Sequence, residues 1–227
     1  MREIVFDTET TGLDPRSGDR MVEIGCIEMV NRVATGQVFH AYFNPERDMP
    51  VEAERVHGLS AVFLSDKPLF RDRAADLLDF LADAPLVAHN AQFDFGFLNA
   101  ELRVCGHGQI GDDRMIDTLA IARRRHPGAK HTLDALCSRY GVDRSHRVLH
   151  GALLDAELLA QVYVELTGGR QIGLELAAED GEQVVRTGTF RPKTGLYRAP
   201  RDYAPSAEEL ARHGQFLESL SEPLWRS

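Results

Sequence analysis

The order of strand-like and helix-like segments along residues 1–168 restricts the possible folds more than any other feature of the chain. The first three runs are typical of strands, and the last two of them flank a connection that suits an antiparallel hairpin; they are residues 3–8, 21–30 and 37–43. Helical periodicity then alternates with one short apolar run typical of a buried strand, at residues 86–88. The helical segments are residues 68–82, 93–104, 118–125, 131–140 and 151–167. This order predicts an α/β fold in which helices flank a mixed β-sheet.

The composition changes beyond this part of the chain. Residues 169–205 contain five glycines and three prolines and show little periodicity, which is typical of a flexible linker. Ordered structure is predicted to resume at Ser206, which has the capping-box spacing to Glu209. The predicted parts are a compact domain, a flexible linker and a short terminal helix, at residues 1–168, 169–205 and 206–227.

Apolar side chains recur along the predicted terminal helix. Four leucines fall on one of its faces and the only tryptophan follows them; these residues are Leu210, Leu217, Leu220, Leu224 and Trp225. A helix of this length at the end of a flexible linker is only marginally stable alone, so we expect its apolar face to dock on another protein. Docking on the chain's own first domain is the alternative.

The charge balance excludes one class of function. The chain has 26 Lys and Arg residues against 35 Asp and Glu residues, a net charge of −9. Proteins that coat duplex DNA by neutralising its phosphates are normally basic, so this chain is not one of them. A nucleic-acid enzyme is not excluded, because acidic side chains can hold divalent cations that in turn meet phosphates.

Three features predict a cytoplasmic protein without a membrane partner. No apolar run is long enough to span a bilayer, and no signal peptide precedes the first strand. The three cysteines form neither a metal-ligand pair nor a disulfide framework, as is typical of a reducing cytosol; they are Cys26, Cys105 and Cys137.

Asp7 and Glu9 form the first candidate site. Residues two apart on a strand project from the same face, about 6.5 Å apart along the backbone. Neighbouring carboxylates repel unless they share a cation or one is protonated, and hard oxygen ligands suit Mg²⁺ or Mn²⁺. Solvated acids at a strand edge are the alternative, but Val5 and Phe6 make the flanking sequence apolar. The pair is therefore a candidate metal site.

Asp94, His150 and Asp155 lie in two further segments. Asp94 is predicted in the first turn of a helix that follows a strand, where α/β proteins place active sites, although the helix dipole alone also favours an acid there. Asp155 lies one turn into the last predicted helix of the domain, and His150 lies in the loop before it. Histidine exchanges protons near neutral pH, as a general base for water must; a surface histidine beside a capping acid is the alternative.

These residues occur in the order Asp-x-Glu, Asp, His-x4-Asp, which resembles the DEDD superfamily of 3′-to-5′ exonucleases. The residue five before Asp155 is His150, and the residue four before it is Gly151 rather than tyrosine, which fits the histidine (DEDDh) subclass. Three further stretches resemble the proofreading (epsilon) subunits of bacterial DNA polymerase III: residues 56–58, 132–137 and 150–157. The resemblance covers most of residues 3–168 and implies a ribonuclease-H-like fold.

The resemblance implies an activity and a role for each residue. The expected activity removes 3′-terminal nucleotides from single-stranded or frayed DNA and releases nucleoside monophosphates. Two divalent metal ions, Mg²⁺ or Mn²⁺, would flank the scissile phosphate. Asp7, Glu9 and Asp155 would hold one ion, Asp7 would bridge to a second that Asp94 supports, and His150 would deprotonate the attacking water. Candidates to position the terminal nucleotide are Thr8, Glu9, His57, Asn90 and Phe93. His57 is alternatively a loop residue, and Phe93 a core residue.

The tail implies two protein partners. Residues 171–176 resemble the hexapeptide by which bacterial polymerases and repair proteins bind the sliding clamp. Its apolar positions can enter adjacent pockets while the glutamine amide fixes the register; the residues are Gln171, Ile172, Leu174 and Leu176. As in the family, the terminal helix would bind the DNA polymerase III catalytic subunit through its leucine face and Trp225.

Two alternatives compete with this interpretation. A related exonuclease acting on RNA is one, but such enzymes lack this linker, peptide and terminal helix. An inactive tether between polymerase and clamp is the other, but a scaffold has no use for clustered like charges. Asp112, Asp113 and Asp117 resemble a further metal site, yet Gly111 indicates a loop, and we expect all three acids to have structural roles.

Overall fold

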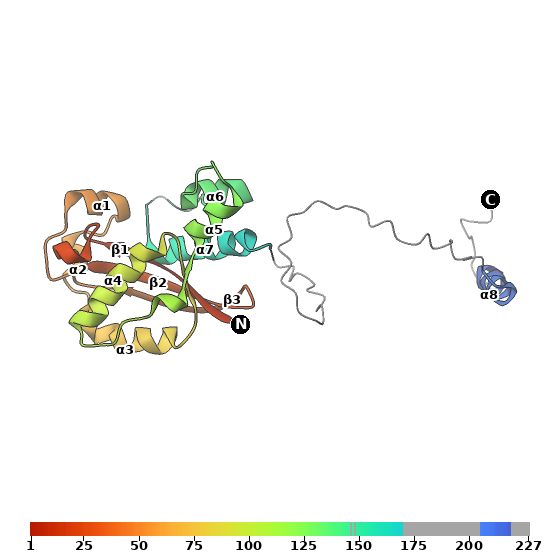
Figure 1. Cartoon of the computed structure of the whole chain (residues 1–227), viewed down its shortest axis with the longest axis horizontal. Helices are drawn as coiled ribbons and strands as arrows, with labels where there is room; N and C mark the ends of the chain where they lie inside the picture. The colour runs from red at the N-terminus through yellow and green to blue at the C-terminus, as the bar shows by residue number, and fades with distance from the viewer. Residues whose placement is uncertain (146, 148, 170–204, 219–227) are drawn as a thin grey trace, which may run out of the picture. The chain divides into compact units, whose positions relative to one another are not determined.

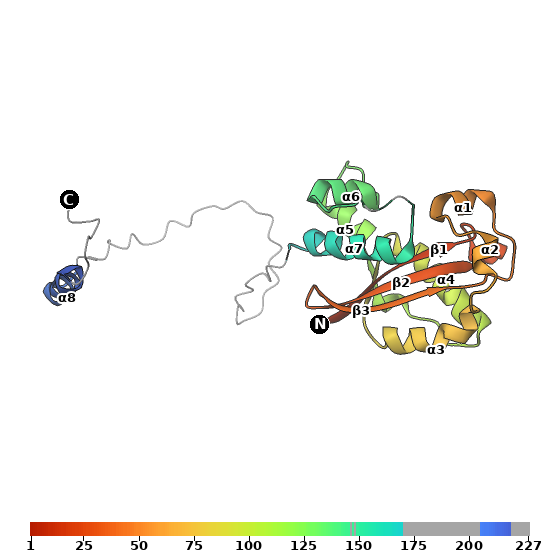
Figure 2. The same cartoon turned by 180° about the vertical axis from the view of Figure 1, so that it is seen from behind.

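The computed structural model describes residues 1–145, 147, 149–169 and 205–218. The chain divides into two units after Glu175, and each unit is described by itself. The predicted clamp peptide lies outside the described residues, as does the predicted linker apart from its two end residues. In the first unit a five-stranded sheet lies between helices on both faces (Figures 1 and 2). The predicted mixed sheet flanked by helices is therefore confirmed.

The sheet has the strand order β3-β2-β1-β4-β5. The strands are β1 (Arg2–Thr10), β2 (Met21–Val30), β3 (Val33–Tyr42), β4 (Leu86–Ala88) and β5 (Met115–Asp117). β2 pairs antiparallel with both β1 and β3, whereas β1, β4 and β5 run parallel to one another. The C-terminal ends of the three parallel strands therefore meet at one end of the sheet.

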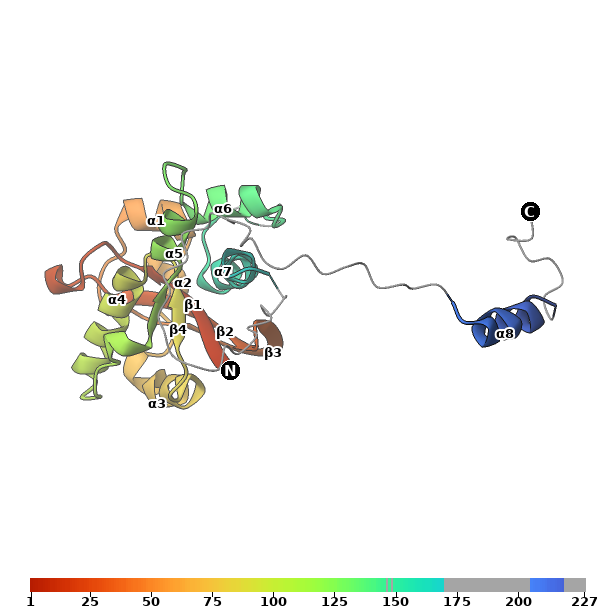
Figure 3. The ribbon, with the colours of Figure 1, turned by 45° about the vertical axis from the view of Figure 1, so that its right-hand side comes forward.

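Seven helices and two short 3₁₀ turns are described in the first unit. The helices are α1 (Val51–His57), α2 (Ala61–Leu64), α3 (Phe70–Leu81), α4 (Ala91–Val104), α5 (Thr118–Arg125), α6 (Leu133–Tyr140) and α7 (Ala152–Leu166). The 3₁₀ turns are η1 (Pro15–Ser17) and η2 (Asp112–Arg114). α7 covers one face of the sheet, and α3 and α4 cover the other (Figure 3). The five predicted helices are present, while α1, α2 and β5 were not predicted.

Strand β1 is the centre of both apolar cores. Ile4 and Phe6 pack with α3 and α4, while Val5 between them packs with α7 on the opposite face. All three side chains are fully buried. Because successive side chains of a strand point to opposite faces, Asp7 and Glu9 continue the row of Val5, on the side of α7.

The hairpin between β2 and β3 is tighter than the sequence predicts. The antiparallel pairing is confirmed, but β3 begins at Val33 and not at residue 37. Asn31 and Arg32 form the connection, both with positive φ angles, of 51° and 65°. Two-residue loops of this kind match the right-handed twist of paired strands.

The second unit contains helix α8 (Ala207–Glu218). Its predicted capping box is present: the Ser206 N–H donates to Glu209 Oε2, and the Glu209 N–H donates to Ser206 Oγ. Leu210 is 55% exposed and Leu217 is partly exposed. The other three predicted anchors, Leu220, Leu224 and Trp225, lie outside the described residues. Among the described residues, no helix has both the length and the apolar character needed to cross a membrane.

Candidate active site

Asp7 and Glu9 lie near the C-terminal end of β1. Glu9 is only 8% exposed, and Asp7 is half-buried. The register with β2 shifts between Glu9 and Thr10, so an irregularity of the bulge type follows the pair directly. Bulges next to a site change the direction in which neighbouring side chains point. The strand therefore presents two carboxylates to one face just where its regular pairing ends.

Asp94 comes to this pair from α4. β4 ends at Ala88 and α4 begins at Ala91, so Asp94 lies in the first turn of the helix, where the sequence predicts it. Asn90, between the two elements, has a φ of 66° and turns the chain from strand into helix. The Thr8 hydroxyl donates a hydrogen bond of 2.8 Å to Asp94 Oδ1, and both side chains are buried. This bond ties the start of α4 to β1.

Asp155 reaches the site because α7 approaches the sheet closely. Gly25 of β2 pairs with Asp7, and a Cβ atom on Gly25 would lie 2.3 Å from the backbone of Leu153. The first turn of α7 therefore rests directly on the strand backbone, and Asp155 is 3% exposed. The sequence does not single out Gly25 as a functional residue, although a glycine inside an apolar strand is a known sign of close backbone approach.

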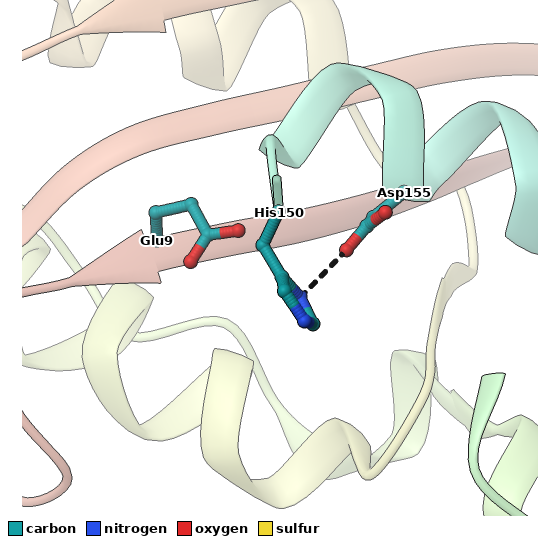
Figure 4. A group of neighbouring side chains, drawn as sticks. All are labelled: Glu9, His150 and Asp155. Atoms are coloured by element: carbon teal, nitrogen blue, oxygen red, sulfur yellow. Dashed lines mark ion pairs between the residues drawn. The ribbon is translucent and has the colours of Figure 1, made fainter. Parts of the chain in front are cut away.

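His150 lies in the loop before α7, as the sequence predicts. Its Nδ1 atom is 3.2 Å from Asp155 Oδ2, and 48% of its side chain is exposed (Figure 4). The His150 N–H donates to the carbonyl oxygen of Val56, in α1. Gly58, which ends α1 with a φ of 75°, leaves room for Leu149: a Cβ on Gly58 would lie 2.6 Å from Leu149 Cδ1. Helix α1 thus holds the loop that carries His150.

The structure brings together the five residues for which catalytic roles are predicted. All of them line one cavity of about 820 Å³: Asp7, Glu9, Asp94, His150 and Asp155. Glu9, His150 and Asp155 each offer a ligand atom, and these atoms lie within 4.8 Å of one another (Figure 4). The contributing elements are a strand, two helices and a loop, which are far apart in the sequence.

The crowded carboxylates change one another's protonation. Burial raises the pKa of Glu9 to about 8, and the charge of Asp155 adds to this effect. Burial also raises the pKa of Asp94 to about 7, although the hydrogen bond from Thr8 opposes the shift. The pKa of Asp7 lies well above its usual range because of burial and then the charges of Asp94, Glu9 and Asp155. Such a cluster is stable only with a proton or a cation among the acids.

Arg147 supplies a positive charge inside the cluster. Its guanidinium donates two hydrogen bonds to Asp155, of 2.5 and 2.7 Å, and one of 2.7 Å to Asp134. Its Nη2 atom also lies 2.7 Å from His150 Nδ1. The sequence gives no signal for this role, because an arginine in a polar loop resembles any surface arginine. The structure shows that its side chain is only 9% exposed.

The donor set fits divalent cations. Carboxylate oxygens are the preferred ligands of hard ions, and a histidine nitrogen is close enough to join them. Burial and the neighbouring carboxylates raise the pKa values of Asp7 and Glu9 even though Arg147 lowers both. A cation held by Asp155 would take over the carboxylate oxygens that Arg147 contacts.

The residues predicted to position a nucleotide line this cavity or the one beside it. Asn90 lines the acidic cavity, and His57 lines an adjoining cavity of about 510 Å³. Thr8, Glu9 and Phe93 line both. The Phe93 ring is half-buried against the apolar core and also lines both cavities, so a core position does not exclude the predicted role in positioning a nucleotide.

His57 has a buried hydrogen-bond donor without a partner. It is the last residue of α1, so the alternative that it lies in a loop is wrong. The Leu59 N–H donates to its Nδ1 at 3.0 Å, which leaves the proton of the neutral ring on Nε2. Among the described residues, Nε2 makes no hydrogen bond of regular geometry, although the backbone of Thr10 lies near the ring and favours its charged form. Burial has the larger effect: it lowers the pKa of the ring and favours the neutral form. Because an unpaired buried donor is costly, this atom indicates a place for a ligand acceptor.

Of the other acids singled out by the sequence, Asp117 has the predicted structural role. Asp117 accepts hydrogen bonds from the Leu119 N–H at the start of α5 and from the Asn90 N–H. Asp112 and Asp113 form the 3₁₀ turn η2. None of these three acids lines the acidic cavity.

Known proteins share this sequence and fold. The RNase T family, described as exonuclease, matches residues 4–163. DNA polymerase III subunit epsilon of Rickettsia felis is 53% identical over 97% of each chain. Exonuclease X, solved in complex with 5′-overhanging duplex DNA, has 25% identity and a TM-score of 0.55 over 72% of this chain and 90% of its own.

A solved DEDDh nuclease domain supports the fold assignment. The nuclease domain of 3′hExo, described as a DEDDh family member bound to rAMP, has a TM-score of 0.63 at 16% identity, over 73% of this chain and 91% of its own. The expected ribonuclease-H-like fold is thereby confirmed. The sequence, the fold and the grouped acids agree: the chain belongs to the exonuclease family and, within it, to the DNA polymerase III epsilon subunits.

Proposed function

We propose that this chain proofreads for the replicative DNA polymerase by removing 3′-terminal nucleotides from single-stranded or frayed DNA. The observation that carries the proposal is the convergence of four carboxylates and His150 in one cavity. Four acids without cations would repel a phosphodiester, whereas the same acids with cations attract one. The family membership supports the reaction class, and the site supports the roles of individual residues.

The four acids would hold two divalent cations. Asp7, Glu9 and Asp155 would hold one, and Asp7 together with Asp94 would hold the second. We propose Mg²⁺ or Mn²⁺, because the four side chains offer only hard carboxylate oxygens. When bound, the cations stabilise the charge on the attacking and leaving oxygens of the phosphodiester.

His150 would take the proton of the attacking water. The water oxygen forms a bond to phosphorus, and the bond from phosphorus to the 3′-oxygen of the preceding nucleotide breaks. The 3′-oxygen takes a proton from solvent to become a hydroxyl, and a nucleoside 5′-monophosphate is released. Arg147 and Asp155 both contact His150 Nδ1 and orient the ring, and the exposed part of the ring can pass the proton to solvent. Val56 fixes the backbone of the same residue from α1.

The adjoining cavity would receive the terminal nucleoside. Leu13, Val56 and Phe93 give it an apolar wall that suits a base, and the unpaired His57 Nε2 donor suits an oxygen of the nucleotide. Both cavities share Thr8, Glu9 and Phe93, so a nucleoside in one places its phosphate at the other. Asn90, at the start of α4, would also help to position the terminal nucleotide.

The tail would connect the enzyme to its partners. The relatives are named as subunits of DNA polymerase III, which supports docking of the terminal helix on the catalytic subunit through its leucine face. The peptide at residues 171–176 would bind the sliding clamp through its glutamine and alternating apolar residues. The same assignment implies a location in the bacterial cytoplasm.

The test compares Asp7→Asn with Asp112→Asn on a primer with a mismatched 3′ end. Loss of a shared cation ligand should lower Mg²⁺-dependent cleavage by about 1000-fold, whereas the exposed control acid should have no effect. All-RNA oligonucleotides of the same sequence should be cleaved more slowly than DNA, since the 2′-hydroxyl is the systematic difference. Wild-type activity of Asp7→Asn, or a preference for RNA, would contradict the proposal.

A further inference from the structure

A basic segment borders the acidic cavity of this acidic protein. Residues 122–131 contain Arg123, Arg124, Arg125 and Lys130 and no acidic residue, in a chain of net charge −9. They cover the last residues of α5 and the connection towards α6. We call residues 122–131 the basic segment.

The basic segment forms part of the wall of the catalytic cavity. Arg123 and His131 line the same cavity as Asp7 and Glu9. Leu119, one helical turn before Arg123 in α5, lines it as well, so one face of this helix is turned to the cavity. A ligand that extends out of the acidic site along this wall therefore meets the cations of the segment.

These cations are available to a ligand. Arg123, Arg124 and Lys130 are exposed, and no ion pair or hydrogen bond joins their side chains to other residues in the part of the chain that the structure describes. Arg147 in the same cavity differs, because Asp155 and Asp134 already occupy its guanidinium.

The surroundings of the segment are electropositive. Burial and then the charges of Arg139, Arg125 and His131 lower the pKa of His126, which lies between α5 and the rest of the segment. Arg139 is an exposed residue of α6, so positive charge continues beyond the segment itself. The positive surface is therefore broader than a single side chain.

We propose that the basic segment binds the phosphates of the DNA strand upstream of the scissile bond. The inference rests on the proposed function: when the last phosphodiester lies at the acids, the preceding nucleotides must leave the cavity along one of its walls. The negative charge of the rest of the protein repels that strand, and a wall with unpaired guanidinium groups attracts it. Guanidinium groups match phosphate oxygens in pairs, which gives the strand a direction as well as affinity.

The experiment compares two double variants that each remove two exposed arginines. Arg123→Gln/Arg124→Gln alters the basic segment, and Arg71→Gln/Arg103→Gln alters α3 and α4, whose arginines do not line the acidic cavity. For wild type and both variants, kcat/KM is measured with a DNA dinucleotide and with a single-stranded twelve-nucleotide DNA between 50 and 200 mM salt. The dinucleotide has no upstream phosphates, so it reports on the catalytic site alone.

The wild-type protein should cleave the longer strand more efficiently than the dinucleotide, and this advantage should fall as salt rises. Each phosphate contact to a single strand contributes about 0.7 to the slope of log affinity against log salt concentration. Loss of two contacts should therefore make the fall in kcat/KM between 50 and 200 mM salt about sevenfold smaller. Arg123→Gln/Arg124→Gln should lose most of the length advantage, so that its ratio of kcat/KM for the longer strand to kcat/KM for the dinucleotide falls towards one. The control pair should retain the wild-type ratio.

Two results separate the possible failures. If the wild-type protein cleaves neither DNA, the proposed function fails. If it cleaves both, but Arg123→Gln/Arg124→Gln keeps the full length advantage and its salt dependence, the upstream strand does not use the basic segment. Equal melting temperatures of the variants show that neither result comes from misfolding.

Discussion

The acidic site consists of two parts that are built differently. Asp7, Glu9, Asp94 and Asp155 belong to a central strand and to the first turns of two helices, where backbone hydrogen bonds and close packing fix them. His150 belongs to the loop before α7 and is half exposed. Charge is thus held by rigid elements, while the proton-transfer group lies where solvent reaches it. The comparison indicates that the four acids hold cations and that His150 transfers protons.

Removal of the loop histidine should have the largest effect on rate with the smallest effect on metal binding. We expect His150→Ala to lower kcat by about 10²- to 10⁴-fold, the usual contribution of a general base. Mn²⁺ affinity, measured by calorimetry, should stay close to that of wild type, because the four acids remain. His107→Ala, an exposed histidine of the connection after α4, is the control. A parallel loss of Mn²⁺ binding and activity would remove the distinction between the two parts.

A change in the rigid part should affect both properties together. Gly25→Ala places a Cβ where the backbone of Leu153 lies, so the first turn of α7 must move and take Asp155 with it. A displacement of Asp155 by about 1 Å should lower activity by about 100-fold and weaken Mn²⁺ binding. The free energy of unfolding should fall by about 1–3 kcal/mol.

The matched control for this variant is Gly96→Ala in α4. A Cβ on Gly96 meets no atom within 4 Å, so this substitution should be neutral or slightly stabilising. Full activity of Gly25→Ala would show that the contact between α7 and β2 does not position Asp155.

Local signals in the sequence predict most of the fold. Alternation and helical periodicity predict β1, β2 and the five longer helices, because these elements bury whole faces. α2 and β5 contain only four and three residues, too few to show a period. α1 is exposed over most of its length, so it lacks an apolar stripe.

The site is predictable only in part, for a related reason. Asp7, Glu9, Asp94, His150 and Asp155 form a pattern of residue types in order. Gly25 and Arg147 depend instead on which segments meet in space. Their functions arise from the approach of α7 to β2 and from the path of one loop, and neither is encoded in local spacing.

Replacement of Arg147 should change metal binding in the opposite direction from loss of an acid. Arg147 and a divalent cation need the same oxygens of Asp155. We expect Arg147→Gln to bind Mn²⁺ about tenfold more tightly, because the cation no longer has to displace a hydrogen bond to a charged group, whose free energy corresponds to about that factor. Arg144→Gln, which removes a half-exposed partner of Asp134, is the control. Unchanged or weaker binding by Arg147→Gln would show that the two cations do not compete.

Removal of metal should make the stability of the protein depend on pH. In the folded protein, burial raises the pKa of Glu9 to about 8 and that of Asp94 to about 7, whereas unfolded carboxyls titrate near pH 4. The folded state therefore binds more protons between these limits, and its stability falls as pH rises through 7 and 8. In EDTA, the melting temperature should therefore be lower at pH 8.5 than at pH 5.5. Each carboxyl should contribute several degrees to this fall, since one pKa unit corresponds to about 1.4 kcal/mol and 1 kcal/mol to about 2–4 °C.

Added Mn²⁺ should reverse this loss, because the cation replaces the protons. Asp94→Asn should reduce the dependence on pH in EDTA, and Asp112→Asn should leave it as in wild type. An identical pH dependence in the presence and absence of metal would contradict the assignment of these acids as ligands.

Anomalous diffraction from crystals soaked in Mn²⁺ tests the central claim most directly. The proposed ligand set predicts manganese peaks in the acidic cavity, within coordination distance of Asp7 and of carboxylate oxygens from both Glu9 and Asp155. In the same crystals, Arg147 should have released the oxygens of Asp155. Peaks bound to the strand acids alone, or manganese only outside this cavity, would contradict a site in which β1 and α7 hold the cation together.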